Sequence, residues 1–130
     1  MGMVEDVAAY LETNGVGTRA VDLFVAHMPS TPSDVISLTQ SGGFQPTDTM
    51  SGTSHENPVL YVNLRHASYP TGYTKITTIF TLLHRFHGAL VGGGTRYLSI
   101  LARSSPAALG VDENNRHRWS LTFDIRKELV

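Results

Sequence analysis

The sequence contains no cysteine, which removes several kinds of chemistry. Without thiols there is no disulfide, thiolate-bound zinc, iron–sulfur cluster or cysteine nucleophile. Charged residues are also scarce, at 16% of the chain against about 25% in an average globular domain. With 41% hydrophobic residues and a net charge of -1, the composition excludes a disordered chain and a uniformly basic nucleic-acid binder. The 130 residues predict one packed domain, 1–130.

Long apolar runs are missing as well. No run approaches the roughly 18 residues that a membrane-spanning helix needs. The N-terminus carries Glu5 and Asp6, where a secretory signal peptide would have Lys or Arg. We therefore expect a soluble protein without an export signal.

The sequence offers no catalytic motif. Glycines 92–94 lack the Lys-Ser/Thr ending of a P-loop, and no serine lies in a GxSxG elbow. His84 and His87 lie three residues apart on one predicted helix, where both could bind a metal. Catalytic zinc needs about three protein ligands, so we interpret these histidines as complements to the negative end of the helix dipole.

The few charges are unevenly distributed along the chain. Residues 1–60 carry a balance of -6, with Arg19 as their only base, whereas residues 61–130 carry +5. Eight of the ten bases are arginines, which suit ion pairs made across contacts. Either the two halves pack together and mix their charges over one monomer, or the acidic side of one copy meets the basic side of the next. Composition alone favours the first alternative.

A nucleic-acid interface would have to use the basic second half. Arginines occur there on two predicted strands and the turn between them, near Tyr97 and Trp119. However, the pI is about 6.6 and Trp119 lies on the apolar side of its strand, so the pattern supports this function only weakly.

Hydrophobic periodicity predicts an α+β fold. The last strand alternates apolar and polar residues, which is typical of an antiparallel sheet with one wet face. The order α-β-β-β-α-β-β predicts an antiparallel or mixed sheet of about five strands with two main helices packed on it. The second helix carries two apolar stripes, which indicates a further partner, either the first helix or another subunit. We predict helices over 4–13 and 70–87, and strands over 20–28, 34–40, 59–66, 96–103 and 118–126.

Residues 41–58 show no periodicity and are predicted to form a long loop. Structureless connections of more than about 12 to 15 residues are uncommon in compact domains, and are often functional. Phe44 and Met50 are the only large apolar residues in this segment. We hypothesise that it is an arm that reaches a neighbour. The alternative is a flexible surface loop without a partner.

Several short motifs occur in an order that is specific as a set, although each one is weak. Together they resemble the tail terminator proteins of long-tailed bacteriophages, the group also labelled phage minor capsid proteins. The motifs are Tyr10-Leu11 before a glycine turn, His27-Met28-Pro29, Pro32-Ser33-Asp34, Gly42-Gly43, Asn57-Pro58-Val59, Asn63-Leu64-Arg65, Ser68-Tyr69-Pro70-Thr71-Gly72-Tyr73, and the Pro-x-x-Leu-Gly-x-Asp-Glu run from Pro106 to Glu113.

The resemblance implies a structural virion protein of the phage neck rather than an enzyme, with no cofactor and no metal. Such proteins form a hexameric ring that caps the tail tube, ends its polymerisation and joins the tail to the head connector or stopper protein. They assemble in the host cytoplasm, and genomic DNA would pass through the ring without sequence-specific binding. The alternatives are another head–tail adaptor component, or a small metal-binding or hydrolytic enzyme that uses His84 and His87.

The resemblance makes the arm hypothesis more specific, since residues 41–58 would touch a neighbouring subunit or the adjoining tube or connector ring. The arm hypothesis and the charge pattern suggest which residues form the contact between subunits. The expected interface residues are Gly42, Gly43, Phe44, Asp48, Met50, His55, Arg65, Arg96 and Arg103.

Overall fold

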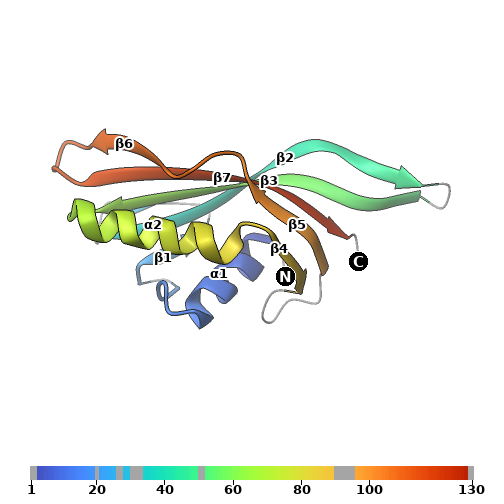
Figure 1. Ribbon diagram of the computed structural model, residues 1–130, viewed down its shortest axis with the longest axis horizontal. Helices are drawn as coiled ribbons and strands as arrows, with labels where there is room; N and C mark the ends of the chain where they lie inside the picture. The colour runs from blue at the N-terminus through green and yellow to red at the C-terminus, as the bar shows by residue number, and fades with distance from the viewer. Residues whose placement is uncertain are drawn as a thin grey trace.

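The computed structural model describes residues 3–19, 21–25, 28–29, 34–49, 52–89 and 96–128 (Figure 1). Within this part the chain is an α+β fold with a mixed sheet, as predicted. The elements are α1 (Met3–Thr13), β1 (Leu23–Val25), β2 (Val35–Thr49), β3 (Gly52–His66), α2 (Tyr69–Leu83), β4 (Phe86–Ala89), β5 (Arg96–Ala102), β6 (Ala107–Val111) and β7 (His117–Glu128).

The described strands form one seven-stranded sheet in the order β1-β2-β3-β7-β5-β4. β1 runs parallel to β2, and every other neighbouring pair is antiparallel. β6 lies off this path and pairs only with β7, on the same side of β7 as β5. The central strands were predicted, whereas β4 and β6 were not. The described sheet therefore has more strands than the predicted number of about five.

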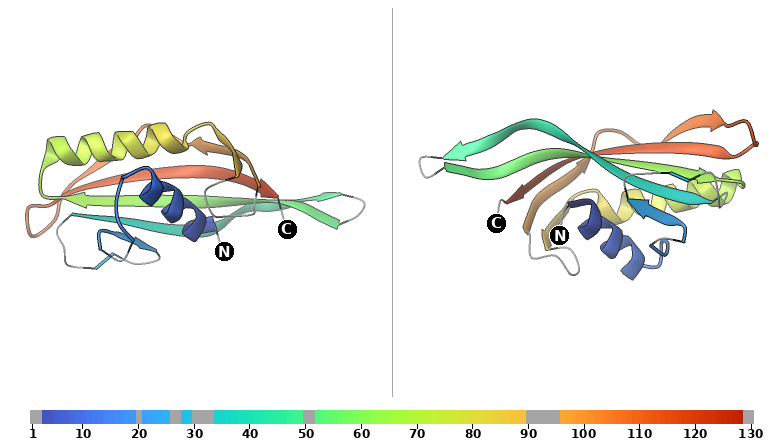
Figure 2. Two further views of the ribbon diagram at one scale, coloured as in Figure 1. Left: turned by 90° about the horizontal axis from the view of Figure 1, so that it is seen from below. Right: turned by 180° about the vertical axis from the view of Figure 1, so that it is seen from behind.

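The core lies between the two helices and one face of the sheet (Figure 2). Strand register aligns the buried side chains, since Leu38 lies opposite Val62 and Val62 lies opposite Leu121. α1 contacts β1 and β2, whereas α2 contacts β3, β5 and β7. The opposite face is more polar, with Thr39, Tyr61 and Thr122 in register across its centre.

The prediction of a loop over 41–58 is wrong, because this segment is the outer part of a long β2–β3 hairpin. The ladder continues from the Ser41–Val59 pair to the Thr49–Gly52 pair. Register shifts fall between Ser41 and Phe44 and between Phe44 and Thr47. These irregularities accommodate the two glycines and the proline that broke the periodic pattern, since bulges tolerate both residue types. The hairpin projects beyond the rest of the sheet (Figures 1 and 2).

The second helix ends at Leu83, so the prediction that His84 and His87 share a helix is wrong. His84 has extended backbone angles, and Arg85 takes the left-handed conformation, with φ 67°. The N–H of Arg85 then donates to the carbonyl of Ile100, 2.7 Å away, and the chain enters β4. Pairing with β5 therefore ends the helix earlier than its own periodicity predicted. His87 lies on β4.

The first helix agrees with its prediction. Its C-terminus is closed by Gly15 at φ 76°, followed by a hydrogen bond from the Val16 N–H to the Leu11 carbonyl. A left-handed glycine is the common way to end a helix, because it carries no Cβ. Neither described helix is long and apolar enough to cross a bilayer.

Candidate assembly surfaces

His84 is engaged inside the subunit and is not arranged as a metal ligand. Its Nδ1 accepts a hydrogen bond from the Ala102 N–H at 3.0 Å, and its ring stacks on Phe80 with centroids 4.9 Å apart. The described part of the chain contains no group of three histidine or carboxylate side chains that could hold a metal. The imidazole of His84 thus ties the turn after α2 to the end of β5.

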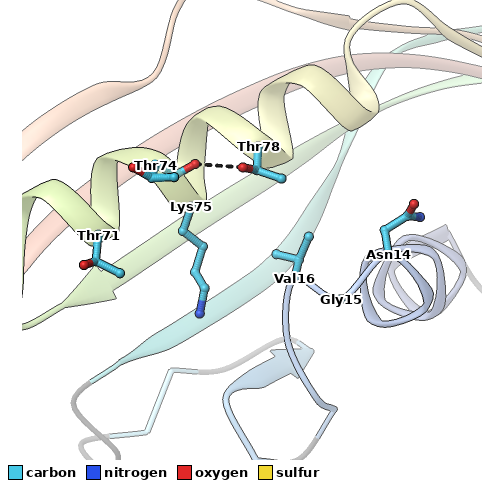
Figure 3. Close-up of a pocket in the computed structure, with 7 residues that line it drawn as sticks. All are labelled: Asn14, Gly15, Val16, Thr71, Thr74, Lys75 and Thr78. Atoms are coloured by element: carbon cyan, nitrogen blue, oxygen red, sulfur yellow. Dashed lines mark hydrogen bonds between the residues drawn. The ribbon is translucent and has the colours of Figure 1, made fainter.

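A groove lies between the helices, and threonines of α2 form much of its lining (Figure 3). It encloses about 220 Å³ and is lined by α2 and the turn that follows α1. The hydroxyls of Thr74 and Thr78 donate to the carbonyls of Pro70 and Thr74, one turn earlier, so they serve their own helix. Lys75 is the only charged residue among the described residues that line the groove.

One end of the subunit is the hairpin arm, which we define as residues 41–49 and 52–58 of β2 and β3. Gly42, Gly43, Phe44, Asp48 and His55 all lie on it, with Phe44 opposite Asn57 and Asp48 opposite Thr53. Met50 lies outside the described residues. β1 pairs with β2 only at residues 36–38, so the outer edge of β2 in the arm has no strand partner among the described residues.

Arg96 lies beside the root of this arm. It is the first residue of β5, next to Tyr97, which pairs with Lys127 of β7. Lys127 in turn lies opposite Glu56, and Glu128 lies opposite His55. The fold thus brings Arg96 and His55 to one region, although they are far apart in sequence.

Arg65 lies near the other end of β3 and is almost fully buried, at 6% exposure. Its Nη2 donates to the Pro29 carbonyl at 2.6 Å. Burial, followed by the nearby charges of Arg116 and Arg118, lowers the pKa of Arg65. Its guanidinium therefore holds the segment before β2 against the sheet, and little of it is left to face another subunit.

Arg103 lies on the face of the sheet that the helices leave uncovered. Its Nε donates to both carboxylate oxygens of Asp124, at 3.0 and 3.1 Å, and its Nη2 lies 3.0 Å from Oδ1. These bonds raise the pKa of Arg103. Both side chains are partly exposed, so the pair adds little stability but holds the arginine in one orientation.

The opposite end of the subunit carries an apolar surface that sequence reasoning missed. We call it the β6 end and define it as β6 with Tyr69 and Tyr73 of α2. All five β6 residues are exposed, and Leu109 and Val111 are 52% and 54% exposed. Tyr69 and Tyr73 are about half exposed, at 49% and 52%. Four of the six large apolar side chains that are exposed in the described residues therefore gather here.

Trp119 supports the two tyrosines from beneath. The centroid of its ring lies 5.0 Å from that of Tyr69 and 5.6 Å from that of Tyr73. The ring of Tyr69 also packs edge-on against His117, with centroids 5.3 Å apart. Trp119 is only 3% exposed, and its indole N–H has no hydrogen-bond partner among the described residues. Gly72 makes this packing possible, because a Cβ at that position would lie 2.9 Å from the indole nitrogen. The tyrosine-rich run 68–73 was the available sequence signal.

A tight turn holds β6 against β7. Asp112 accepts hydrogen bonds from the backbone N–H groups of Arg116 and Asn114, both at 2.9 Å, and from Arg116 Nε at 2.8 Å. These bonds lower the pKa of Asp112, and the bond from the backbone N–H of Arg116 has the largest effect. The carboxylate thus organises the turn that presents β6. A depression of about 400 Å³ borders this turn and is lined by Val111, Asp112, Glu113, Asn114, Arg116 and Arg118.

Comparison with known proteins first defines the class of fold. The chain resembles a chain in the solved virion of a native gene transfer agent (GTA) particle, with a TM-score of 0.55 and 20% identity. The likeness covers 95% of this chain and 84% of that chain. At this identity the likeness is one of fold. No curated protein matches the sequence.

The family follows from the sequence. Residues 10–129 match the model of the bacteriophage tail terminator protein family, and the chain belongs to that family. It is therefore a structural component of a bacteriophage virion, at the tail or neck. The resemblance drawn from the short motifs is confirmed.

Proposed function

We propose that this protein forms a closed ring, of six copies, that caps the tail tube, ends its polymerisation and joins the tail to the head connector. Family membership supports a role at the end of the tail. The observation that carries the ring is the difference between the two ends of the subunit, a projecting hairpin arm at one and the apolar β6 end at the other (Figure 1). Two unlike surfaces suit a head-to-tail contact, which gives a ring when the rotation between neighbouring copies closes and an open filament when it does not.

The charge distribution supports the same arrangement. The ion pairs Arg19–Glu12, Arg103–Asp124 and Arg116–Asp112 each join groups from the same half of the sequence. Elsewhere the halves meet inside one subunit, since Lys127 lies opposite Glu56 and Nδ1 of His66 lies 3.5 Å from Oδ1 of Asp34. Part of the imbalance of -6 and +5 is therefore left for a contact between copies. Complementary charges on two surfaces set the orientation and register of a contact more than its strength. A head-to-tail ring would use the imbalance in this way, and genomic DNA would pass through its centre without base-specific contacts.

Electron microscopy of the purified protein, and of particles made without it, tests the proposal. We expect six-fold rings from the protein, and overlong tails that lack heads when it is missing. Normal tail lengths and normal head joining without the protein would contradict the proposal. Tails of normal length that fail to join heads would favour a head–tail adaptor instead.

A shortened arm tests whether the hairpin takes part in assembly. Removing 48–54 and joining Thr47 to His55 through an Asn-Gly turn preserves the pairing of His55 and Glu56 with β7. We expect a folded subunit that no longer forms rings or joins tails. Unchanged assembly by this variant would show that the tip of the arm makes no essential contact.

A further inference from the structure

We propose that β6 is the acceptor strand of the subunit contact, and that its occupant is the hairpin arm of a second copy, added along the free edge of β6. This inference rests on the proposed ring and names the surfaces that close it. Tyr69 and Tyr73 would form the floor on which the added strand packs.

The first argument is the state of the β6 edge. β5 and β6 both pair with β7 on the same side, but β4 covers β5 alone. Among the described strands nothing pairs with the outer side of β6. Natural edge strands are usually protected by charges, by proline or by being very short. The sequence Ala107-Ala108-Leu109-Gly110-Val111 has no charge and no proline, and it is longer than the edge strands β1 and β4. Its pairing with β7 has one register shift, between Ala108 and Gly110.

The second argument is the apolar surface next to this edge. Val111 lies opposite His117, His117 contacts Tyr69, and Tyr69 and Tyr73 both rest on Trp119. The half-exposed rings therefore continue from the edge of β6 across the first turns of α2. Aromatic residues with one buried and one open face are typical of the centres of protein contacts.

The third argument concerns the occupant. Strand addition needs a partner with an unpaired edge, and β2 in the hairpin arm offers one beyond Leu38. The arm projects at the end of the molecule opposite β6, so it is placed to reach the next subunit and not its own β6 (Figure 1). Glu56 of the arm lies opposite Lys127 of its own subunit, so Asp48 is the acidic residue that the arm has left for a partner. Arg118 of β7 lies exposed opposite Gly110 of β6 and would supply the opposite charge.

Lysine substitutions test the acceptor edge. Leu109→Lys with Val111→Lys places two charges on side chains that are already half exposed, so the subunit should still fold. We expect the protein concentration for half-maximal ring assembly to rise about tenfold or more. Val21→Lys is the matched control, because Val21 is 59% exposed at a distance from β6, and it should assemble as the parent does. Analytical ultracentrifugation and native mass spectrometry measure both.

Several outcomes of the lysine test would overturn the inference. If the double-lysine variant forms rings normally, the inference about β6 is wrong, whereas the proposal that the protein forms a ring still stands. Rings that form normally but no longer dock on tails would assign β6 to a different virion protein. If the parent protein itself forms no ring, alone or on tails, the proposed function fails first.

Cysteine cross-linking tests the occupant directly, and the absence of native cysteine makes it specific. Leu109→Cys and a set of single cysteine variants along residues 41–49 are prepared separately, mixed and treated with a short thiol-to-thiol linker. We expect cross-linked dimers only when the two kinds of subunit are mixed, and none with Val21→Cys. Cross-linking of Leu109→Cys with itself would indicate a symmetric contact, and rings without any mixed cross-link would place the arm elsewhere; either result overturns the inference.

Discussion

The phenol oxygen of Tyr97, on β5, donates a 2.8 Å hydrogen bond to Oδ2 of Asp6, in α1, across 91 residues of sequence. Both residues are almost completely buried, at 0% and 1% exposure. Burial, together with this bond to a carboxylate, raises the pKa of Tyr97 well above its ordinary value. The bond therefore fastens the first helix to the distal part of the sheet.

Replacing Tyr97 by phenylalanine should destabilise the subunit by about 1–3 kcal/mol, because the change leaves Oδ2 of Asp6 buried without its donor. Within the described part of the chain, Oδ1 of the same carboxylate already has no hydrogen-bond partner. Urea unfolding at neutral pH measures the effect. The double variant Tyr97→Phe with Asp6→Ala is the control, and its cost should be smaller than the sum of the two single costs. Strict additivity would show that the bond contributes nothing.

Gly72→Ala should destabilise the subunit by about 1–3 kcal/mol, since the added methyl overpacks the site. The new Cβ would lie 2.9 Å from the indole nitrogen of Trp119 and 3.1 Å from Cβ of His66. Thermal unfolding can be followed by the fluorescence of Trp119, the only tryptophan. Gly42→Ala is the matched control, because a Cβ there meets no atom of the described residues within 4 Å. Equal melting temperatures for the two variants would contradict the packing argument.

Acid should open the β6–β7 turn before the rest of the sheet. The pKa of Asp112 is lowered in the folded state, so its stabilising contribution is complete above the unfolded value of about 4 and is lost as the pH falls below it. We expect hydrogen exchange in 107–111 to accelerate under these conditions relative to β3. Asp112→Ala should show the same fast exchange already at neutral pH. Uniform exchange across the sheet in the variant would refute a local role for this carboxylate.

Raising the salt concentration should dissociate rings more readily than it unfolds subunits. Charges at an exposed contact are screened within about 3 Å at 1 M salt, whereas the apolar core is not weakened. Sedimentation at low and high salt measures the ring, and urea unfolding at the same concentrations measures the subunit. Parallel loss of both would count against charge pairing between copies.

Local sequence patterns correctly predicted the elements that bury one face and expose the other. β7 buries Trp119, Leu121, Phe123 and Ile125 and leaves Arg118 and Arg126 exposed, which is the alternation its sequence shows. The first helix was predicted for the same reason, because one of its faces is buried in the core. In such elements the spacing of the apolar residues is enough to predict which face is buried.

The candidate site was harder to predict. Residues 41–58 were predicted to contact a neighbour, and they do form the projecting segment. They were predicted as a loop because their glycines and prolines break the alternation of a strand, and the ladder there has register shifts. Arg65 was chosen for its charge, yet its place on β3 buries it. Tyr69, Tyr73, Leu109 and Val111 were overlooked, because exposure of an apolar residue cannot be read from its type.

By itself the sequence determined the absence of thiol chemistry, the division of charge between the two halves, the α+β class and, through its motifs, the family. These depend on composition and on patterns within a few neighbouring residues. Only the tertiary structure decided that 41–58 is a hairpin, that α2 stops at Leu83, that 107–111 is an open edge strand and that Asp6 meets Tyr97. Each of these depends on hydrogen bonds or contacts between segments that are distant in sequence, and no local pattern records which partner a strand will find.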